Sequence, residues 1–431
     1  MSTEMGVRRI TGGTPLKGNM SVPGDKSISH RALLLGGLGE GVTSIRNLAP
    51  GEDVESTMKV LGELGVEVED DGREVQVHGS GLGGFTEPDG PLDAGNSGTL
   101  MRLISGIIAG QRFEATITGD TSLRSRPMDR IIGPLTEMGA IIRAEDGTAP
   151  LTITGSRLSG VTHRPNVASA QVKSCLLLAG LHAEGETTVV EPGPSRDHTE
   201  RMLAAMGYPI EIAEEGITVD GPAPLEPIEV EVPGDFSSAA FFIAGGLLVE
   251  GSNLIIRDVG LNDTRTGFLD LVDKMDAKIE VKNRRVEKGE PRGDLRVRHS
   301  ELSGVELGGE DVVKAIDELP LLGVVATQAE GKTVVRGAEE LRVKETDRIS
   351  ATVDNLRSLG ADVEELKDGF IVDGGGGLTG GTVDSYRDHR IAMGAAVAAQ
   401  VATGSTRLTG SEWVEVSFPG FFEKLEELKN G

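Results

Sequence analysis

Two cations and a hydroxyl stand at the start of an apolar stretch near the N-terminus. Residues 23–41 read PGDKSISHRALLLGGLGEG and bring Lys26, Ser27 and Arg31 to the mouth of a leucine-rich run. On a helix, Ser27 and Arg31 would share one face because they are one turn apart. A cation at a helix N-terminus opposes the dipole at a cost of up to about 1 kcal/mol, which a bound anion offsets. The stretch therefore predicts either plain core or an anion site.

Residues that bind anions or move protons recur at the start of further predicted helices. Ser, Asn and Asp there are most often N-caps, and Asp347 or Asp388 could hold Arg348 or Arg390 in an ordinary ion pair. Several cations at helix starts in an acidic chain nevertheless favour an anionic ligand. The further clusters are residues 96–99, Arg124 and Arg126, Ser169 and Gln171, Arg196, Asp317 and Glu318, Lys344, Glu345 and Arg348, and residues 387–390.

The stretches that carry these residues are copies of one repeat. Each is an apolar helix that closes on a glycine, and the closing glycines fall about 70 residues apart, which indicates structural repeats. A β-like run follows each glycine, and an amphipathic helix follows each run. The apolar stretches cover residues 24–41, 95–110, 169–185, 234–251, 315–331 and 387–404, and the amphipathic helices residues 54–65, 129–139, 199–207, 267–275, 347–360 and 421–431.

The apolar helices should lie inside the protein, because they are apolar nearly all round. The chain also divides in half, since VPGD occurs at residues 22–25 and again at 232–235. The sixth repeat ends at its second helix, and the N-terminal strands within residues 7–24 would supply what it lacks. We therefore expect one domain of residues 1–22 and 233–431, a second of residues 23–232, and a ligand site between them.

Composition excludes several classes of protein. A formal net charge of -25 repels nucleic acid, and 3% aromatic residues offer few stacking platforms for bases. The start of the chain lacks the apolar core of a secretory leader, and the apolar run at residues 239–249 is too short to span a bilayer. One cysteine, Cys175, predicts a buried apolar residue and fits a reducing cytoplasm. No metal-ligand spacing or dinucleotide-binding context is present, so no metal or cofactor is expected.

Seven blocks of the sequence resemble the signature blocks of one family, the EPSP synthases (3-phosphoshikimate 1-carboxyvinyltransferases) of aromatic amino acid biosynthesis. The blocks are GDKSISHRALLLG, NSGTLMRL, LRSRPM, SAQVKSCLLLAGL, AIDELP, LRVKETDRI and DHRIAM, and they occur in the family's order. The resemblance implies an α/β fold, an inside-out α/β barrel of two pseudo-symmetric domains with three repeated α/β units each. That number of units agrees with the six repeats counted above.

The resemblance also implies the reaction. The enolpyruvyl group of phosphoenolpyruvate would pass to the 5-hydroxyl of shikimate 3-phosphate, with release of phosphate, by addition and elimination through a tetrahedral intermediate. Both substrates are small anions, which would explain the cations at the helix starts, and the family implies a cytoplasmic enzyme that we expect to be a monomer.

Site residues follow from the resemblance position by position. The residues implied for shikimate 3-phosphate are Lys26, Ser27, Arg31, Ser169, Ala170, Gln171, Arg196, Asp317 and Lys344. Those implied for phosphoenolpyruvate are Lys26, Gly98, Arg126, Gln171, Arg348 and Arg390. The fork of an arginine suits carboxylate and phosphate groups.

Four residues are implied for catalysis. Asp317 would take the proton of the attacking hydroxyl, with help from Lys344. Glu345 would handle the proton of the methylene carbon, and Lys26 would serve the leaving phosphate. Because these residues come from both halves of the chain, catalysis would need the domains to close.

Two features of the sequence distinguish this chain from some family members. Val416 stands where some members carry Lys, before the SFP segment. Gly98 is the small residue of members that glyphosate inhibits, whereas some tolerant forms have Ala.

Two alternatives remain from the sequence. The enolpyruvyl transferase that acts on UDP-N-acetylglucosamine shares the fold, but many of its members carry a reactive Cys in a mobile loop, and residues 119–130 here contain none. A non-catalytic anion-binding module is the other alternative. The carboxylates Asp317 and Glu345 argue against it, because binding anions alone does not need them.

Overall fold

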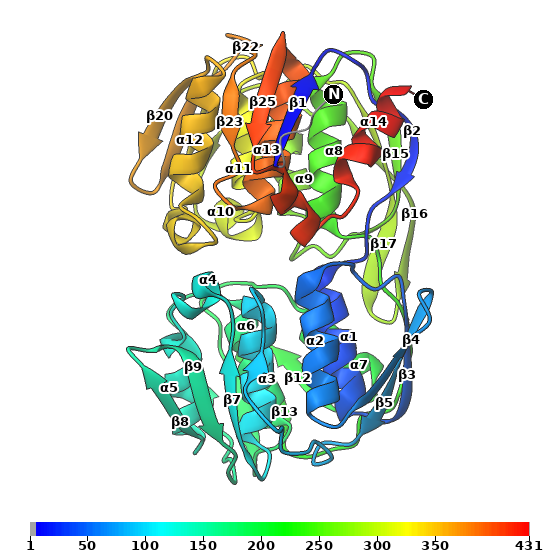
Figure 1. Ribbon diagram of the computed structural model, residues 1–431, viewed down its shortest axis with the longest axis vertical. Coiled ribbons are helices and arrows are strands. Elements are labelled where there is room, and N and C mark those ends of the chain that lie inside the picture. Colours follow the sequence, from blue (N-terminus) through cyan, green and yellow to red (C-terminus); the bar gives the residue numbers. More distant parts are fainter. Residues whose placement is uncertain (1–5, 431) are drawn as a thin grey trace. The chain divides into compact units, whose positions relative to one another are not determined.

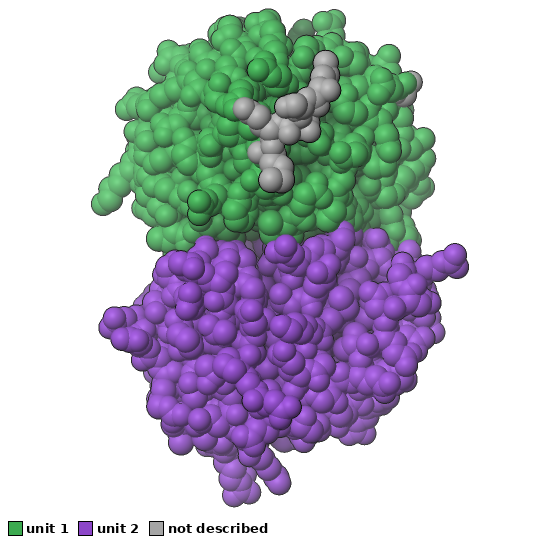
Figure 2. All heavy atoms as spheres, in the orientation of Figure 1, with its two compact units in different colours: residues 1–23, 233–285, 291–431 green, residues 24–232, 286–290 purple. Residues whose placement is uncertain are grey.

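The computed structural model describes residues 6–430 and divides into two compact units, which Figure 2 colours separately. Unit 1 comprises residues 1–23, 233–285 and 291–431, and unit 2 comprises residues 24–232 and 286–290. Each unit has a hydrophobic core of its own. Numbered along the chain, repeats one to three lie in unit 2 and repeats four to six in unit 1.

In unit 2 the apolar stretches form helices, labelled in Figure 1, whose residues are buried on nearly all sides. They are α1 (Lys26–Leu38), α3 (Gly98–Ala109) and α6 (Ala170–Gly180). Helix α3 packs against both α1 and α6. Its approach to α6 requires a glycine, because a Cβ at Gly106 would lie 2.1 Å from the carbonyl oxygen of Cys175. The prediction of interior helices is confirmed.

The second helices of unit 2 bury one side each. In α2 (Glu52–Glu63) the buried residues Val54, Thr57 and Leu61 recur every three or four positions. The other two are α5 (Asp129–Glu137) and α7 (His198–Ala205), and a short helix, α4 (Thr121–Arg124), precedes α5.

Each repeat of unit 2 also has a four-stranded sheet. The strand orders are β14-β3-β5-β4, β6-β7-β9-β8 and β10-β11-β13-β12, with the first pair in each order parallel and the others antiparallel. The strands are β3 (Glu40–Arg46), β4 (Glu67–Asp70), β5 (Glu74–Ser80), β6 (Leu92–Asp93), β7 (Glu114–Thr118), β8 (Ile141–Glu145), β9 (Thr148–Thr154), β10 (Thr162–His163), β11 (Glu186–Val189), β12 (Ile210–Ala213), β13 (Gly216–Asp220) and β14 (Glu229–Glu231).

Unit 1 repeats this plan. Its buried helices, which contact one another, are α8 (Phe236–Leu248), α11 (Leu319–Ala326) and α13 (His389–Val401). Its other helices are α9 (Gly267–Lys274), α10 (Glu310–Lys314), α12 (Arg348–Ser358) and α14 (Phe421–Asn430), with two 3-10 turns, η1 (Glu339–Val343) and η2 (Ser411–Val416). The inside-out α/β architecture, with interior helices and outer sheets in each unit, is confirmed.

The sheets of unit 1 have the orders β16-β17-β15-β2, β18-β19-β21-β20, β1-β25-β23 and β22-β24. The strands are β1 (Val7–Thr11), β2 (Lys17–Ser21), β15 (Asn253–Gly260), β16 (Ile279–Glu287), β17 (Glu290–Arg298), β18 (Glu306–Leu307), β19 (Lys332–Val335), β20 (Asp362–Leu366), β21 (Gly369–Asp373), β22 (Leu378–Thr379), β23 (Thr382–Asp384), β24 (Ala402–Thr403) and β25 (Ser405–Thr409).

The two N-terminal strands join different repeats. Strand β1 joins repeat six, as predicted, and pairs antiparallel with β25, with Val7 opposite Thr409. Strand β2 pairs parallel with β15 of repeat four, so the prediction that both strands complete repeat six is wrong for β2. The reason is a vacancy in repeat four: the strand before α8, β14, pairs with β3 of repeat one, and β2 fills the parallel edge that β14 leaves.

None of the helices within residues 6–430 is long and apolar enough to cross a lipid bilayer.

Candidate active site

The first turn of α1 fixes Lys26 in place. Asp25 caps the helix by accepting a hydrogen bond from the backbone N–H of Ile28 at 2.9 Å. The preceding turn needs Gly24, because a Cβ there would lie 1.9 Å from the carbonyl oxygen of Asn47. The Lys26 side chain is 32% exposed and its Nζ donates to Oδ2 of Asp53 at 2.7 Å. The lysine is therefore held at the helix mouth by an acid from the next helix.

Arg31 lies one turn after Ser27, on the same face of α1, as predicted. Its Nη1 donates to the carbonyl oxygen of Ser27 at 2.9 Å, its Nε to Oγ1 of Thr199 at 2.7 Å, and its Nη2 to Oγ of Ser174 at 2.7 Å. Burial lowers the pKa of Arg31 to about 10; the carboxylates of Glu200 and Asp25 oppose this shift, and the charge of Arg196 adds to it. Arg31 therefore supports the backbone of Ser27, and the charge of a second cation, Arg196, acts on it.

Helix α3 begins at Gly98, beside two guanidinium groups. Ser97 caps the helix by accepting from the backbone N–H of Leu100 at 3.1 Å. A Cβ at Gly98 would lie 2.8 Å from Nη1 of Arg102 and 3.4 Å from Nη1 of Arg126. The absent side chain thus leaves room for both cations at the first turn.

Gln171 links the first turns of α6 and α3. Its Nε2 donates to Oγ1 of Thr99 at 3.0 Å, and its Oε1 accepts from Nη1 of Arg102 at 2.7 Å. Ser169 is the N-cap of α6, and Ala170 is its first residue. These contacts bring the predicted residues of repeats two and three to one place within unit 2.

Arg126 is held by the loop before α3. Its Nη2 donates to Oδ1 of Asn96 at 2.7 Å. The Nδ2 of Asn96 in turn donates to Oδ2 of Asp120, the N-cap of α4, at 2.6 Å. The neighbouring Arg124 is exposed. Of the two arginines noted in this segment, Arg126 is the one that belongs to the cluster around Gly98.

In unit 1 the predicted residues meet around Asp317, which lies just before α11. Its Oδ1 is 3.4 Å from Nζ of Lys344 and 3.4 Å from Nη1 of Arg348, and its Oδ2 is 3.9 Å from Nη2 of Arg390. The Asp317 side chain is only 12% exposed. Three cations, two from residues 344–348 and one from α13, therefore surround one carboxylate.

Arg348 is the most deeply buried of these cations. Its Nε donates to Oδ2 of Asp388 at 2.7 Å, and its Nη2 donates to Oε2 of Glu345. Burial alone disfavours the charged form, but the carboxylates of Asp388, Glu345 and Asp317 raise the pKa of Arg348 above its ordinary value. The guanidinium is thus a permanent charge at this site.

Some residues of these clusters were not indicated by the sequence. Asp53 is far from Lys26 in the chain and belongs to no motif. Arg102 did carry a signal, because it is the one charged residue of α3 and lies four positions after Gly98. Lys173 is 2% exposed and lies 2.7 Å from carboxylate oxygens of both Glu191 and Glu200, which ties α6 to the segment that contains Arg196.

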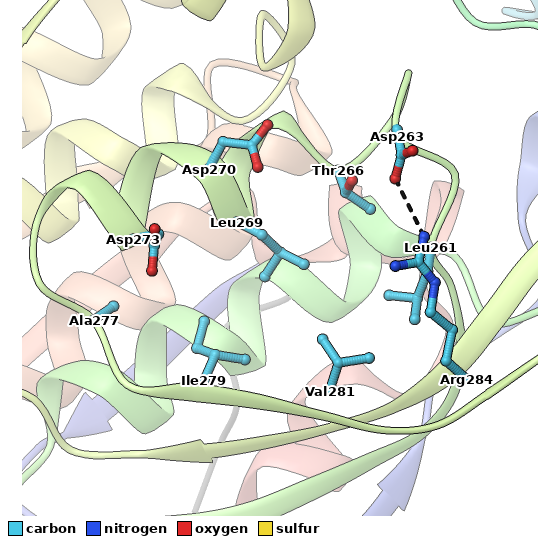
Figure 3. Close-up of a pocket in the computed structure, with 10 residues that line it drawn as sticks. All are labelled: Leu261, Asp263, Thr266, Leu269, Asp270, Asp273, Ala277, Ile279, Val281 and Arg284. Atoms are coloured by element: carbon cyan, nitrogen blue, oxygen red, sulfur yellow. Dashed lines mark ion pairs between the residues drawn. The ribbon is translucent and has the colours of Figure 1, made fainter.

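Other features of the described residues do not coincide with the predicted site. Unit 1 contains a pocket of about 260 Å³, lined in part by Asp263, Asp270 and Arg284 (Figure 3), but none of the predicted site residues lines it. Within residues 6–430 no group of three or more His, Cys, Asp or Glu residues could hold a metal ion. Cys175 is buried, as predicted, and burial raises the pKa of its thiol to about 12.

Comparison with known proteins identifies the family. The sequence profile of "EPSP synthase (3-phosphoshikimate 1-carboxyvinyltransferase)" matches residues 10–425. A 3-phosphoshikimate 1-carboxyvinyltransferase of Citrifermentans bemidjiense is 50% identical over 413 residues, which are 95% of this chain and 96% of the relative. The enzyme of the same name from Desulfitobacterium hafniense is 52% identical over 417 residues, 96% of this chain and 95% of the relative.

Solved structures agree with the sequence relatives. The structure of EPSP synthase from Acinetobacter baumannii superposes with a TM-score of 0.89 at 43% identity and covers 98% of each chain. The profile spans nearly the whole sequence, and the relatives are similar to it along almost their full length. The chain therefore belongs to the EPSP synthase family.

Proposed function

We propose that the clusters of the two units carry the reaction of this family: the transfer of the enolpyruvyl group from phosphoenolpyruvate to the 5-hydroxyl of shikimate 3-phosphate. The observation that carries the proposal is the convergence of Lys344, Arg348 and Arg390 on Asp317. A carboxylate among three cations can take a proton, and the cations let it lie beside anionic substrates. A structural ion pair does not need three cations, and a simple anion site does not need a carboxylate.

Shikimate 3-phosphate binds chiefly through unit 2. Lys26, Arg31 and Arg196 supply positive charge for its phosphate and Ser27 a hydroxyl, in agreement with the effect of the Arg196 charge on Arg31. Ser169, Ala170 and Gln171 contact the ring at the first turn of α6, while Asp317 and Lys344 approach the 5-hydroxyl. The polar N-terminus of α6 suits this role because its first backbone N–H groups are not used within the helix.

Phosphoenolpyruvate is held by arginine forks. Arg126 beside Gly98 belongs to unit 2, and Arg348 and Arg390 belong to unit 1. Gln171 and Lys26 contact both substrates. Guanidinium groups bind carboxylate and phosphate in two places at once, and their charge is independent of pH in the working range.

The chemistry runs in two steps. Asp317, with Lys344 beside it, accepts the proton of the 5-hydroxyl as the oxygen bonds to C2 of phosphoenolpyruvate. Glu345 delivers a proton to C3, which becomes a methyl group and gives a tetrahedral intermediate. In the second step the methyl group returns a proton to the Glu345 carboxylate, the C2–C3 double bond reforms, and the bond between C2 and the phosphate oxygen breaks. Phosphate then leaves with Lys26 stabilising its charge. The roles fall on both units, so the reaction needs both.

Phosphate release tests the proposal. The protein should release phosphate from phosphoenolpyruvate only when shikimate 3-phosphate is present, and UDP-N-acetylglucosamine should not replace it. Asp317→Ala should abolish release while shikimate 3-phosphate still binds in calorimetry. Release with the nucleotide sugar would favour the alternative transferase, and unchanged turnover of Asp317→Ala would refute the base.

Two further expectations belong to this proposal. The protein acts as a monomer and in the cytoplasm, where its buried thiol needs no disulfide partner. Light scattering after gel filtration measures the mass in solution against the 45.2 kDa of one chain, and cell fractionation tests the compartment.

A further inference from the structure

A buried polar cluster lies behind Arg390 in unit 1. It consists of Ser237 in the first turn of α8, Arg265 in the segment before α9, and Glu318 at the N-cap of α11. The exposed fractions of these residues are 5%, 4% and 2%. Oδ1 of Asp235, the N-cap of α8, lies 3.6 Å from Nη2 of Arg265 and gives this guanidinium a second carboxylate neighbour. The catalytic roles described above use none of these residues.

The hydroxyl of Ser237 is the centre of the cluster. It donates to Oε1 of Glu318 and accepts from Nη2 of Arg265 and from Nη1 of Arg390, the latter at 3.0 Å. A hydroxyl has one hydrogen to donate and two lone pairs to accept with. All of its bonding capacity is therefore used, and this fixes the positions of two guanidinium groups relative to one carboxylate.

These contacts hold Arg390 by one end of its guanidinium. Nη1 contacts three oxygens: Oε1 of Glu318 at 3.1 Å, Oγ of Ser237 at 3.0 Å and the carbonyl oxygen of Asp317 at 3.3 Å. Among the described residues Nη2 has one ion pair, at 3.9 Å, and the side chain is 13% exposed. Among the described residues the edge formed by Nε and Nη2 makes no hydrogen bond to Ser237, Arg265 or Glu318, and that edge is the fork that binds a carboxylate or a phosphate.

The cluster is poorly arranged for stability alone. Oε2 of Glu318 is buried and accepts no hydrogen bond from the described residues. A buried carboxylate oxygen without a partner is a cost in folding, and such departures concentrate at functional sites. The negative charge of Glu318 instead offsets two neighbouring guanidinium groups, which would otherwise repel each other.

We propose that Glu318, Ser237 and Arg265 are positioning residues that hold Arg390 by Nη1, so that its Nε–Nη2 edge is ready for phosphoenolpyruvate. The inference rests on the proposed role of Arg390 and adds the residues that orient it. None of the three touches the substrate. Their contribution is to keep one rotamer of a long side chain in place before the substrate arrives.

Glu318→Gln tests the inference, because it keeps the shape of the side chain and removes the charge. The KM for phosphoenolpyruvate should rise about tenfold, the effect of one weakened charge-assisted hydrogen bond, while kcat and the KM for shikimate 3-phosphate change less than threefold. Ser237→Ala should give the same pattern if Glu318→Gln does not fold, and Ser237→Thr, which keeps the hydroxyl, should restore much of the loss.

A double-mutant cycle separates positioning from a general structural effect. Arg390→Lys should raise the KM for phosphoenolpyruvate by itself, and Glu318→Gln should add little in that background. Asp294→Asn is the matched control, because Asp294 is a buried acid of unit 1 that pairs with Arg257 at 2.7 Å outside the cluster. It should lower the melting temperature without changing either KM.

The outcomes are distinct. If Arg390→Lys leaves the KM for phosphoenolpyruvate unchanged, the assignment of the site is wrong. If Arg390→Lys raises it but neither Glu318→Gln nor Ser237→Ala does, the positioning role is refuted while the site assignment stands. Equal effects of Glu318→Gln in the wild-type and Arg390→Lys backgrounds also refute positioning through Arg390.

Discussion

Nζ of Lys26 lies 2.7 Å from Oδ2 of Asp53, although the two residues are 27 positions apart in the chain. The pair joins the start of α1 to the start of α2, and it fixes the lysine that we assign to the leaving phosphate. Because the Lys26 side chain is 32% exposed, solvent screens the attraction and the pair adds little to stability.

Asp53→Asn should therefore affect activity more than stability. Without the charge of the Asp53 carboxylate the Lys26 ammonium is held less firmly, and kcat/KM for phosphoenolpyruvate should fall about tenfold. The free energy of unfolding in urea should change by less than about 1 kcal/mol. A large loss of stability with unchanged kcat/KM would contradict this assignment.

Asp388→Ala should destabilise the protein strongly. Arg348 and Asp388 are both almost completely buried, and removal of one partner of such a pair costs about 3–5 kcal/mol. Asp388 also caps α13 by accepting from the backbone N–H of Arg390 at 2.8 Å, which adds to the loss. Urea unfolding measures the cost.

The control for this prediction is an exposed pair in the same unit. Asp373 lies 3.7 Å from Lys332, and both side chains are more than half exposed. Asp373→Ala should change the free energy of unfolding by less than about 1 kcal/mol. Similar losses for the two variants would show that burial does not decide the cost.

Gly98→Ala should weaken inhibition by glyphosate and raise the KM for phosphoenolpyruvate. The new Cβ would lie 2.8 Å from Nη1 of Arg102, so the guanidinium must move, and Gln171 loses its 2.7 Å contact. The new methyl group would also lie 3.4 Å from Nη1 of Arg126, and it narrows the space that we assign to phosphoenolpyruvate beside this arginine. Inhibition constants for the two forms are measured with the phosphate-release assay, and equal constants would refute the prediction.

Because of His30, the free energy of unfolding should decrease when the pH is lowered. Burial, opposed by the charge of Asp53, lowers the pKa of His30 to about 3 in the folded protein, against 6.5 when unfolded. Between these values the unfolded chain binds a proton that the folded chain does not, so the free energy of unfolding decreases as pH falls from about 6.5 toward 3.

His30→Asn removes the group that takes up a proton on unfolding. The free energy of unfolding of this variant should therefore depend less on pH. From pH 7 to pH 4 the variant should lose about 3 kcal/mol less than the wild type, while Asn keeps a polar group near Thr57, whose Oγ1 lies 2.7 Å from Nδ1 of His30. Urea unfolding at a series of pH values measures both slopes. Parallel curves would mean that His30 is protonated in the folded state.

The repeats could be predicted because their signals are local. Closing glycines such as Gly41 and Gly185 have positive φ, so the end of each helix and the start of each strand are visible within a few residues. The pairing of β2 could not be predicted in this way, since it depends on which of two distant sheets lacks a parallel edge.

The site residues that lie in signature blocks of the sequence could be predicted. Asp317, Lys344, Arg348 and Arg390 lie in signature blocks, and the structure brings them together. In the sequence, Arg265 and Ser237 lie outside the signature blocks. The role proposed for them in positioning Arg390 follows only from their contacts with Glu318. The sequence also could not show that Thr199 and Ser174 accept hydrogen bonds from the guanidinium of Arg31, because those contacts join residues far apart in the chain.

The pairing of Val7 with Thr409 has a consequence for synthesis on the ribosome. Unit 2 is nearly continuous in the chain and can fold while translation proceeds, whereas β1 precedes unit 2 and can pair only after unit 2 has been made and β25 has emerged. Strand β1 is thus made before the core of unit 2 but finds its partner after it, and the sheet of repeat six is completed only once the other five repeats have been made.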